Sequence, residues 1–167
     1  MLPEEKIIFY GGTGNHAFDE SVLNLVNKAA KRSYKFTHIW HSTWPDGEPG
    51  FHLSDVETIK GNHVVVFSCP TSFKLESELH DIVIAAKRQY GAKSVTVVLS
   101  FIRYRRQDRP ELTHEITRLR WFMWKLKNEG VDNLIVCEPH SIKYTVQYAQ
   151  EFGLNLLIAD PTKLFAQ

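Results

Sequence analysis

Short apolar runs alternate along the chain with longer stretches in which apolar residues recur at helical spacing. The short runs are rich in Val, Ile and Leu and show no polar alternation, which is typical of strands covered on both faces. We expect strands at Ile7–Tyr10, Phe36–Trp40, Val64–Phe67, Val95–Leu99, Leu134–Cys137 and Leu156–Ala159. The helical spacing predicts helices at Glu20–Lys31, Leu75–Gln89, Thr113–Lys127 and Lys143–Phe152.

The alternation of strands and helices predicts an α/β fold of three layers, α/β/α, around a mainly parallel sheet. The stretch Ser42–Ser54 breaks the alternation, because it is rich in Pro, Gly and aromatic residues and has no helical period. We expect a loop there that runs into a short hairpin near residues 46–54, with Phe51–Leu53 in its second arm. The chain has 167 residues and no internal repeat, so we expect a single domain over residues 1–167.

The net charge of +1 predicts no broad attraction to nucleic acid or to an anionic membrane. The apolar runs are too short to cross a bilayer, and the first residues lack the pattern of a secretion signal. We therefore expect a cytoplasmic protein that binds neither nucleic acid nor membrane. Cys69 and Cys137 each follow an apolar run and are interpreted as buried free thiols.

In a parallel α/β sheet, ligands bind at the carboxyl ends of the strands. Residues 100–109 follow the fourth expected strand and contain four arginines, at positions 103, 105, 106 and 109. Guanidinium groups suit bidentate phosphate binding, and Gln107 could contact a base or a ribose. The alternative is a solvated charge run that Asp108 partly neutralises. The place of the segment in the fold favours a polyphosphate site.

Residues 44–48 read Trp-Pro-Asp-Gly-Glu and offer an aromatic face followed by two carboxylates. Trp44 could stack on a purine, while Asp46 and Glu48 could accept hydrogen bonds from an amine or a ribose hydroxyl. Pro-Asp-Gly is also good turn chemistry, and composition alone favours a turn in which Trp44 is a local packing anchor.

His140 follows the fifth expected strand, where it could contact a metal, donate to phosphate or take part in proton transfer. The preference of magnesium for oxygen ligands weakens a direct histidine–magnesium bond. Residues 12–17 fit a G-x-G-x-x-A pattern, but no acidic residue follows the second strand as a dinucleotide site requires. A plain strand–helix turn is favoured. Trp121, Phe122 and Trp124 are expected in the core or at a subunit interface.

Taken together, these segments resemble the amino-terminal domain of the ribose-phosphate diphosphokinases (PRPP synthetases), whose fold is phosphoribosyltransferase-like. Residues 44–48 resemble that family's Phe-Ser-Asp-Gly-Glu element. Residues 106–109 read Arg-Gln-Asp-Arg and, with Tyr104 before them, match its Tyr-Ala-Arg-Gln-Asp-Arg signature. Residues 130–132 and 138–141 are similar to its Gly-Val-Asp and Asp-Leu-His-Ala elements. Order and approximate spacing agree from about Lys6 to the carboxyl end.

The resemblance implies a synthetase that transfers the β,γ-diphosphoryl group of MgATP to ribose 5-phosphate, giving PRPP and AMP. It implies ATP and Mg²⁺ as cofactors. Trp44 would stack on the adenine, and Asp46 and Glu48 would contact the adenine and ribose of a neighbouring subunit, so a homo-oligomer is implied. Arg106 and Gln107 would bind the nucleotide and its phosphates. His140 would lie at the metal–phosphate site.

The chain also departs from the family pattern. It lacks the family's second domain, with the Thr-Gly-Gly-Thr loop for ribose 5-phosphate, the loop with the catalytic Lys and Arg, and a metal-binding Asp. We therefore expect no catalytic residue here, an inactive isolated domain, and a second-domain or synthetase partner. Arg103 and Arg105 replace small or apolar residues, and residues 110–117 lose positive charge. Two functions stay open, the ATP-binding half of a synthetase and a non-catalytic nucleotide-binding or regulatory homologue. An unrelated dinucleotide-binding domain is disfavoured.

Overall fold

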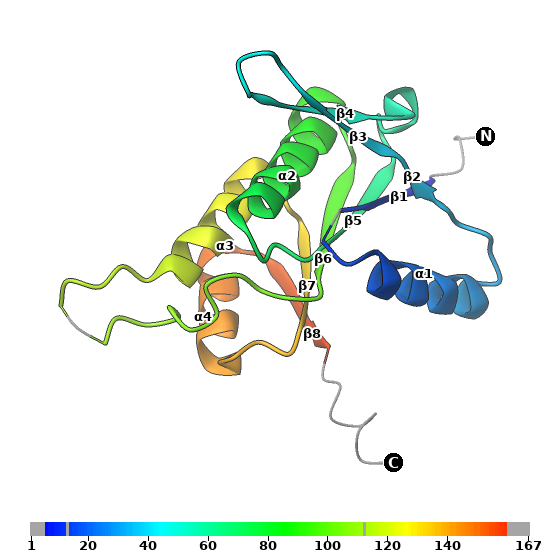
Figure 1. Cartoon of the computed structure of the whole chain (residues 1–167). Helices are drawn as coiled ribbons and strands as arrows, with labels where there is room; N and C mark the ends of the chain where they lie inside the picture. Colours follow the sequence, from blue (N-terminus) through cyan, green and yellow to red (C-terminus); the bar gives the residue numbers. More distant parts are fainter. Residues whose placement is uncertain (1–5, 13, 112, 160–167) are drawn as a thin grey trace.

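The computed structural model describes residues 6–12, 14–111 and 113–159. In this part of the chain, one sheet has the strand order β2-β1-β5-β6-β7-β8, and every neighbouring pair is parallel (Figure 1). The strands are β1 Ile7–Gly11, β2 Phe36–Thr37, β5 His63–Ser68, β6 Ser94–Leu99, β7 Asn133–Cys137 and β8 Asn155–Ala159. The parallel sheet confirms the predicted α/β fold.

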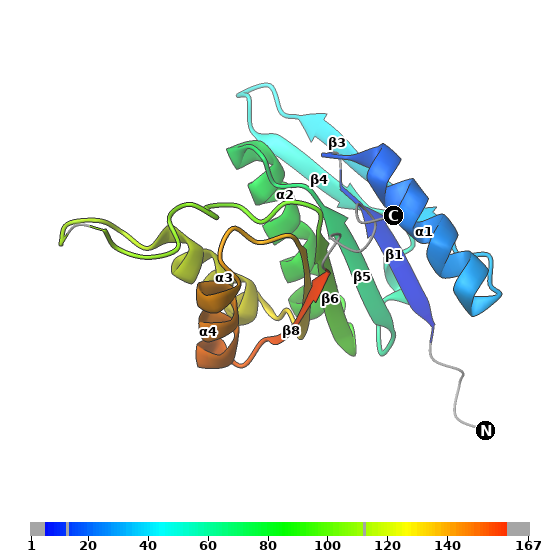
Figure 2. The same cartoon turned by 90° about the horizontal axis from the view of Figure 1, so that it is seen from below.

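The helices cover the two faces of the sheet unequally (Figures 1 and 2). They are α1 His16–Ala30, α2 Phe73–Ile84, α3 Arg118–Glu129 and α4 Ile142–Phe152. The main core lies between the sheet and α2, α3 and α4. On the other face, α1 packs Leu23 against Phe9, Phe67 and Val98. Beyond α1, an apolar hollow of about 640 Å³ extends over residues of β6, β7 and β8.

Local hydrogen bonds set the helix boundaries. α1 begins before the predicted Glu20, because the Asn15 side chain caps it by accepting from the Phe18 N–H at 3.4 Å. α2 continues into a π-helical turn at Ala85–Gln89. α3 begins at Arg118 and not at the predicted Thr113. The Glu115 carboxylate accepts from the Glu111 N–H at 2.7 Å, which holds the preceding segment as a loop.

The predicted strand Phe36–Trp40 is wrong as a single element. β2 ends at Thr37, and β3 Ile39–Thr43 pairs antiparallel with β4 Pro49–Leu53 in a separate sheet. The predicted strand is divided because β1 pairs Tyr10 with Thr37 and then ends at Gly11. The residues after Thr37 therefore have no parallel strand beside them. The hairpin therefore begins at Ile39, earlier than the expected residues 46–54, and a 3₁₀ turn at Val56–Thr58 follows it.

Residues 44–48 form the turn of this hairpin, which we call the hairpin tip. Gly47 donates its N–H to the Trp44 carbonyl at 2.9 Å, and Trp44 donates its N–H to the Glu48 carbonyl at 2.8 Å. Gly47 has φ +90°, a left-handed conformation that glycine adopts without strain. The turn chemistry expected from Pro-Asp-Gly is thus present.

Cys69 and Cys137 are free thiols, as expected, but both are only half-buried. Burial raises the pKa of the Cys137 thiol. In the described part of the chain, no helix is long and apolar enough to span a membrane.

Candidate nucleotide and phosphate site

Residues 100–109, which we call the arginine segment, leave the carboxyl end of β6 and are held firmly against the domain. Ile102 is almost fully buried. The Tyr148 hydroxyl of α4 donates to the Asp108 backbone carbonyl at 2.7 Å, and Asp108 itself is only 2% exposed. These contacts attach both ends of the segment to the core, so its exposed side chains start from a fixed backbone.

Arg103 points into the domain and belongs to a cluster around Glu76 of α2. Its Nε lies 2.7 Å from Glu76 Oε2, a close ion pair whose N–H direction does not make an aligned hydrogen bond. The Tyr104 hydroxyl donates to Glu76 at 2.7 Å and accepts from Arg118 at 2.8 Å. Burial is the main cause that raises the pKa of Tyr104, and the hydrogen bond to Glu76 raises it further. We call these four residues the Glu76 cluster; it neutralises Arg103 inside the protein.

Arg106 and Gln107 have exposed side chains and line a cavity of about 370 Å³. Arg109 also lines this cavity, and its guanidinium nitrogens lie 3.5 Å from Asp108 Oδ1 and 3.6 Å from Glu111 Oε1. Among the residues that the structure describes, Arg106 has no ion-pair partner. Compared with Arg109, Arg106 therefore has the guanidinium more open to an anionic ligand.

His140 lies beside the arginine segment, although it follows a different strand. Its Nδ1 is 3.5 Å from Asp108 Oδ2, a buried oxygen without a hydrogen-bond partner among the described residues. This contact places the exposed imidazole against a buried carboxylate. The structure thus places His140 beside Asp108, the residue that follows Gln107 in the arginine segment.

The groups around Asp108 suit a magnesium ion that takes most of its ligands from elsewhere. Mg²⁺ prefers oxygen ligands and usually keeps several waters or phosphate oxygens. In the described residues, no group of three His, Cys, Asp or Glu side chains could hold a metal. Asp108 and His140 are the described residues at this place that could contribute to a metal taking most of its ligands from elsewhere.

Two loop residues that follow β6 and β7 have a strained backbone. Tyr104 has φ 60° and Glu138 has φ 45°, in the left-handed region that residues other than glycine rarely adopt. Glu138 directly follows β7, and Tyr104 lies within the arginine segment. Such strain gathers at functional sites, where the surrounding contacts hold it in place.

The hairpin tip lies elsewhere. Figure 1 shows it projecting past α2, away from the loop that carries the arginine segment. Trp44 is 58% exposed, so it is not the local packing anchor that its turn suggested. Asp46 and Glu48 are also exposed, and Asp46 Oδ1 accepts from the Glu48 N–H at 3.1 Å. Within one chain, the structure does not bring Trp44, Asp46 and Glu48 to Arg106.

The three neighbouring aromatic residues of α3 divide between the core and the surface. Phe122 is buried in the core, whereas Trp121 and Trp124 are 49% and 44% exposed and pack edge to face on α3.

The turn between β1 and α1 runs close to another backbone: a Cβ on Gly14 would lie 2.6 Å from the Cys69 carbonyl oxygen. Thr13 of that turn lies outside the described residues.

Sequence reasoning missed Glu76, His80 and Glu129. His80 is buried, with Nδ1 2.5 Å from Glu129 Oε2 and Nε2 3.7 Å from Glu76 Oε1. Glu76 and His80 are four residues apart in a predicted helix, which is a usable signal for a pair. Glu129 comes from the end of another helix, and nothing in the sequence links it to His80.

The parallel sheet, with its cationic segment at the carboxyl edge, places the chain in the class of open α/β domains that hold ligands at that edge. Residues 7–130 match the family model described as the N-terminal domain of ribose phosphate pyrophosphokinase. The chain belongs to the ribose-phosphate pyrophosphokinase family, as the resemblance predicted.

Curated relatives and a solved structure agree with this assignment. The ribose-phosphate pyrophosphokinase of Saccharolobus solfataricus is 26% identical over 136 residues, covering 80% of this chain and 44% of the relative. That of Sulfurisphaera tokodaii is 26% identical over 155 residues, covering 93% and 50%. The phosphoribosylpyrophosphate synthetase of Mycobacterium smegmatis has a similar fold, with a TM-score of 0.75 and 19% identity over 96% of this chain and 50% of that one. The chain thus spans about half the length of these relatives.

Proposed function

We propose that the chain is the ATP-binding half of a ribose-phosphate diphosphokinase, the enzyme that transfers diphosphate from MgATP to ribose 5-phosphate and yields PRPP and AMP. One observation carries the proposal. In a member of this family, Arg106 and Gln107 line a cavity at the carboxyl edge of the sheet, on a backbone that Tyr148 and Asp108 fix in place.

The chemistry asked of these residues is binding and charge neutralisation. Arg106 would pair with phosphate oxygens, and Gln107 would contact the nucleotide. His140, oriented through Nδ1 by Asp108, would present Nε2 toward the phosphates and their metal. Mg²⁺ supplies further positive charge against the developing negative charge of the diphosphoryl group.

The base and ribose contacts would come from a second protomer. Trp44, Asp46 and Glu48 are exposed at a hairpin tip that lies away from its own arginine segment (Figure 1). Trp40 on the same hairpin is 64% exposed. A homo-oligomer in which the tip of one protomer reaches the cavity of another would complete the site.

The groups that hold ribose 5-phosphate and perform the transfer would come from a second domain, in the same or a separate chain. The relatives are about twice as long as this sequence, and the apolar hollow beside Ala159 would be covered by such a partner. The chain alone should therefore release no AMP from MgATP and ribose 5-phosphate. Robust turnover by the purified chain would contradict this division of labour.

A second candidate is a non-catalytic nucleotide-binding or regulatory homologue that associates with a synthetase. The observation in its favour is the charge around Arg106. Glu111 and Glu115 line the same cavity, and Arg103 is already neutralised by Glu76. Fewer positive charges are left for a triphosphate than four arginines would suggest. A chain that binds a synthetase but not MgATP would support this candidate.

Titration of MgATP by calorimetry tests the main proposal. A charge-assisted hydrogen bond is worth roughly 1.5–3 kcal/mol, so Arg106→Ala should weaken MgATP binding about tenfold or more. Arg88→Ala is the matched control, since that guanidinium donates to the Asn128 carbonyl in the last turn of α3. Equal affinities for wild type and both variants would exclude the arginine segment as the nucleotide site.

A further inference from the structure

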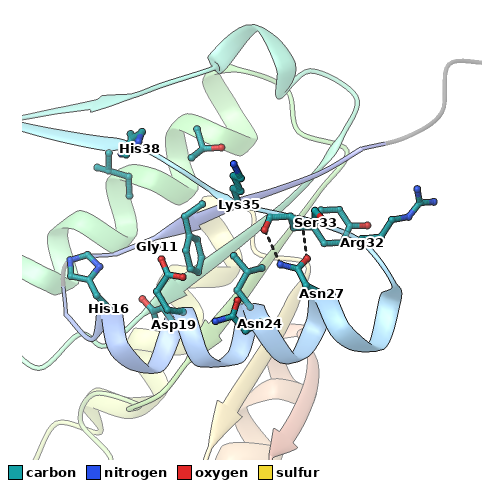
Figure 3. Close-up of a pocket in the computed structure, with 15 residues that line it drawn as sticks. Gly11, His16, Asp19, Asn24, Asn27, Arg32, Ser33, Lys35 and His38 are labelled. Carbon is teal, nitrogen blue, oxygen red and sulfur yellow. Dashed lines mark hydrogen bonds between the residues drawn. The ribbon is translucent and has the colours of Figure 1, made fainter.

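A second cavity, of about 690 Å³, lies between α1 and the segment that leads through β2 into β3 (Figure 3). Its lining includes Gly11 at the carboxyl end of β1 and Thr37 at the carboxyl end of β2. The cavity is within the range of small-molecule sites, roughly 300–1,000 Å³. It shares no lining residue with the cavity around Arg106 and is not used by the proposed ATP site.

Asp19 is a buried acid that faces this cavity. It is 2% exposed, and its Oδ2 has no hydrogen-bond partner among the described residues. Figure 3 shows the side chain extending from α1 into the space between the helix and the strands. Burial raises the pKa of Asp19 from 3.8 to about 6, while the charge of His16 lowers it and that of Glu20 raises it further. At neutral pH the cavity therefore holds a largely ionised carboxylate whose Oδ2 has no hydrogen-bond partner among the described residues.

The two walls of the cavity differ in charge. The α1 wall carries Asp19 and Glu20, and the facing segment carries Arg32 and Lys35. Asn27 fixes the distance between the walls, because its side chain bonds the backbone N–H and carbonyl of Tyr34 at 2.7 and 2.9 Å. The lining is thus neutral overall but polarised, negative on the helix and positive on the strand side.

We propose that this cavity binds a small zwitterion, with its ammonium group on Asp19 and its phosphate or carboxylate group toward Lys35. The ammonium group supplies the donor that Asp19 Oδ2 lacks, and a charged pair of this kind is strong in a buried site. A ligand with only one of the two charges would leave one wall unmatched. The site is independent of the proposed synthetase function, so either proposal can fail without the other.

The test is a titration of the ¹⁵N-labelled chain followed by NMR, with three matched probes. Phosphoethanolamine carries both charges, ethanolamine lacks the anion, and glycerol 3-phosphate lacks the ammonium group. We expect phosphoethanolamine to shift the amide signals of residues 16–24 and 33–38 and to bind about tenfold more tightly than either single-charge probe. Asp19→Asn keeps the size of the side chain and should weaken this binding about tenfold.

Two control variants keep the test specific. Asp81→Asn removes an exposed carboxylate from α2, on the other face of the sheet, and should leave phosphoethanolamine binding unchanged. Arg106→Ala should also leave it unchanged, which separates this site from the nucleotide site. The proposal is overturned if no probe shifts these amides, because a buried water would then satisfy Asp19. Equal affinity for all three probes, or for wild type and Asp19→Asn, overturns it as well.

The carboxyl carbon of Asp19 gives a readout of its own. A bound ammonium group stabilises the ionised form, so saturating phosphoethanolamine should lower the pKa of Asp19 from about 6. His16 and Glu20 on α1, and Lys35 and His38 on the facing wall, also carry or can carry charge, and therefore the Asp19 carbon itself must be observed. A pKa that stays the same when the probe is bound would show that its ammonium group is not on Asp19.

Discussion

The arginine segment and the hairpin tip are both exposed loops, yet the rest of the domain holds them very differently. The arginine segment is tied down by Tyr148 through Asp108 and by the Glu76 cluster through Arg103. The hairpin tip is held by hydrogen bonds within its own turn, such as that from Gly47 to Trp44. Substitutions in the first region should change both stability and binding, whereas substitutions in the second should change binding or assembly alone.

The comparison also shows that a cationic sequence is not the same as a cationic surface. Arg103 is turned inward to Glu76, and Arg109 is shared between Asp108 and Glu111. The acidic tip residues Asp46 and Glu48 remain exposed. The charges that matter for a ligand are those that the fold has not already paired.

Removal of Glu76 should give the largest effect. Glu76→Ala leaves Arg103 with a largely buried, unpaired charge and deprives Tyr104 of its acceptor. We expect a loss of about 3 kcal/mol in the free energy of unfolding, measured by urea denaturation. Asp46→Ala at the hairpin tip should change it by less than about 0.5 kcal/mol.

A double variant checks the cause. Arg103→Met removes the charge that Glu76→Ala leaves buried, so the pair of substitutions should cost less than the sum of the single ones. Additive losses would show that Glu76 acts through packing and not through Arg103.

Asp19 sharpens the comparison, because it is buried and its Oδ2 has no hydrogen-bond partner among the described residues, so the sign of the effect should reverse. Burial raises the pKa of Asp19 from 3.8 to about 6, and the folded protein keeps a proton that the unfolded chain has lost. The contribution of this group to the free energy of unfolding is present below about pH 4 and is lost as the pH rises through about 6, a difference of about 3 kcal/mol. Asp19→Asn should remove this fall and be more stable than wild type at neutral pH. Unfolding curves across this pH range measure it, and a variant with the wild-type pH profile would contradict it.

Trp44→Ala should separate base recognition from phosphate binding. Stacking of a base on an aromatic ring is worth about 1–3 kcal/mol, so the variant should lose about tenfold in ATP affinity and discriminate less between ATP and GTP. Its affinity for free triphosphate should not change, in contrast to Arg106→Ala. Leu25→Ala, which removes an exposed apolar side chain from α1, is the control. An unchanged ATP affinity in Trp44→Ala would remove the hairpin tip from the site.

The smallest expected effect is on self-association of the chain. If the hairpin tip serves a neighbouring protomer, sedimentation should show self-association at high protein concentration, weak in the absence of a second domain. Substitutions at Trp40 and Trp44 should weaken it, while Arg106→Ala should not. A strict monomer at every concentration would argue against a shared site.

The sheet could be predicted because runs such as Val64–Phe67 and Val95–Leu99 are apolar throughout and stand out without polar alternation. The structure buries one face of these strands fully and the other only in part. The split at His38 could not, because it depends on where β1 ends and not on any residue between 36 and 40. The start of α3 depends on a side-chain bond between Glu115 and Glu111, which competes with the helix.

The candidate site, like the fold, could be predicted from the sequence only in part. The contact between Asp108 and His140 follows from the order of the strands, since both residues come after neighbouring strands of a parallel sheet. Asp19 and Glu76 each lie in the first turn of a helix, where an acid usually interacts with the helix dipole at the surface. Their burial depends on which side of the helix meets the rest of the domain, and the motifs carry no information about that.

The strand order also decides when the domain can assemble. The hairpin pairs residues close in sequence, such as Trp40 with His52, and can close within microseconds. β1 must instead wait for β5, since Ile7 pairs with His63 and the pairing encloses the whole first helix and the hairpin. Distant pairing of this kind slows folding. During synthesis, the first strand therefore remains without its central neighbour until residue 68 has left the ribosome, and in that interval α1 and the hairpin are the structures that can already form.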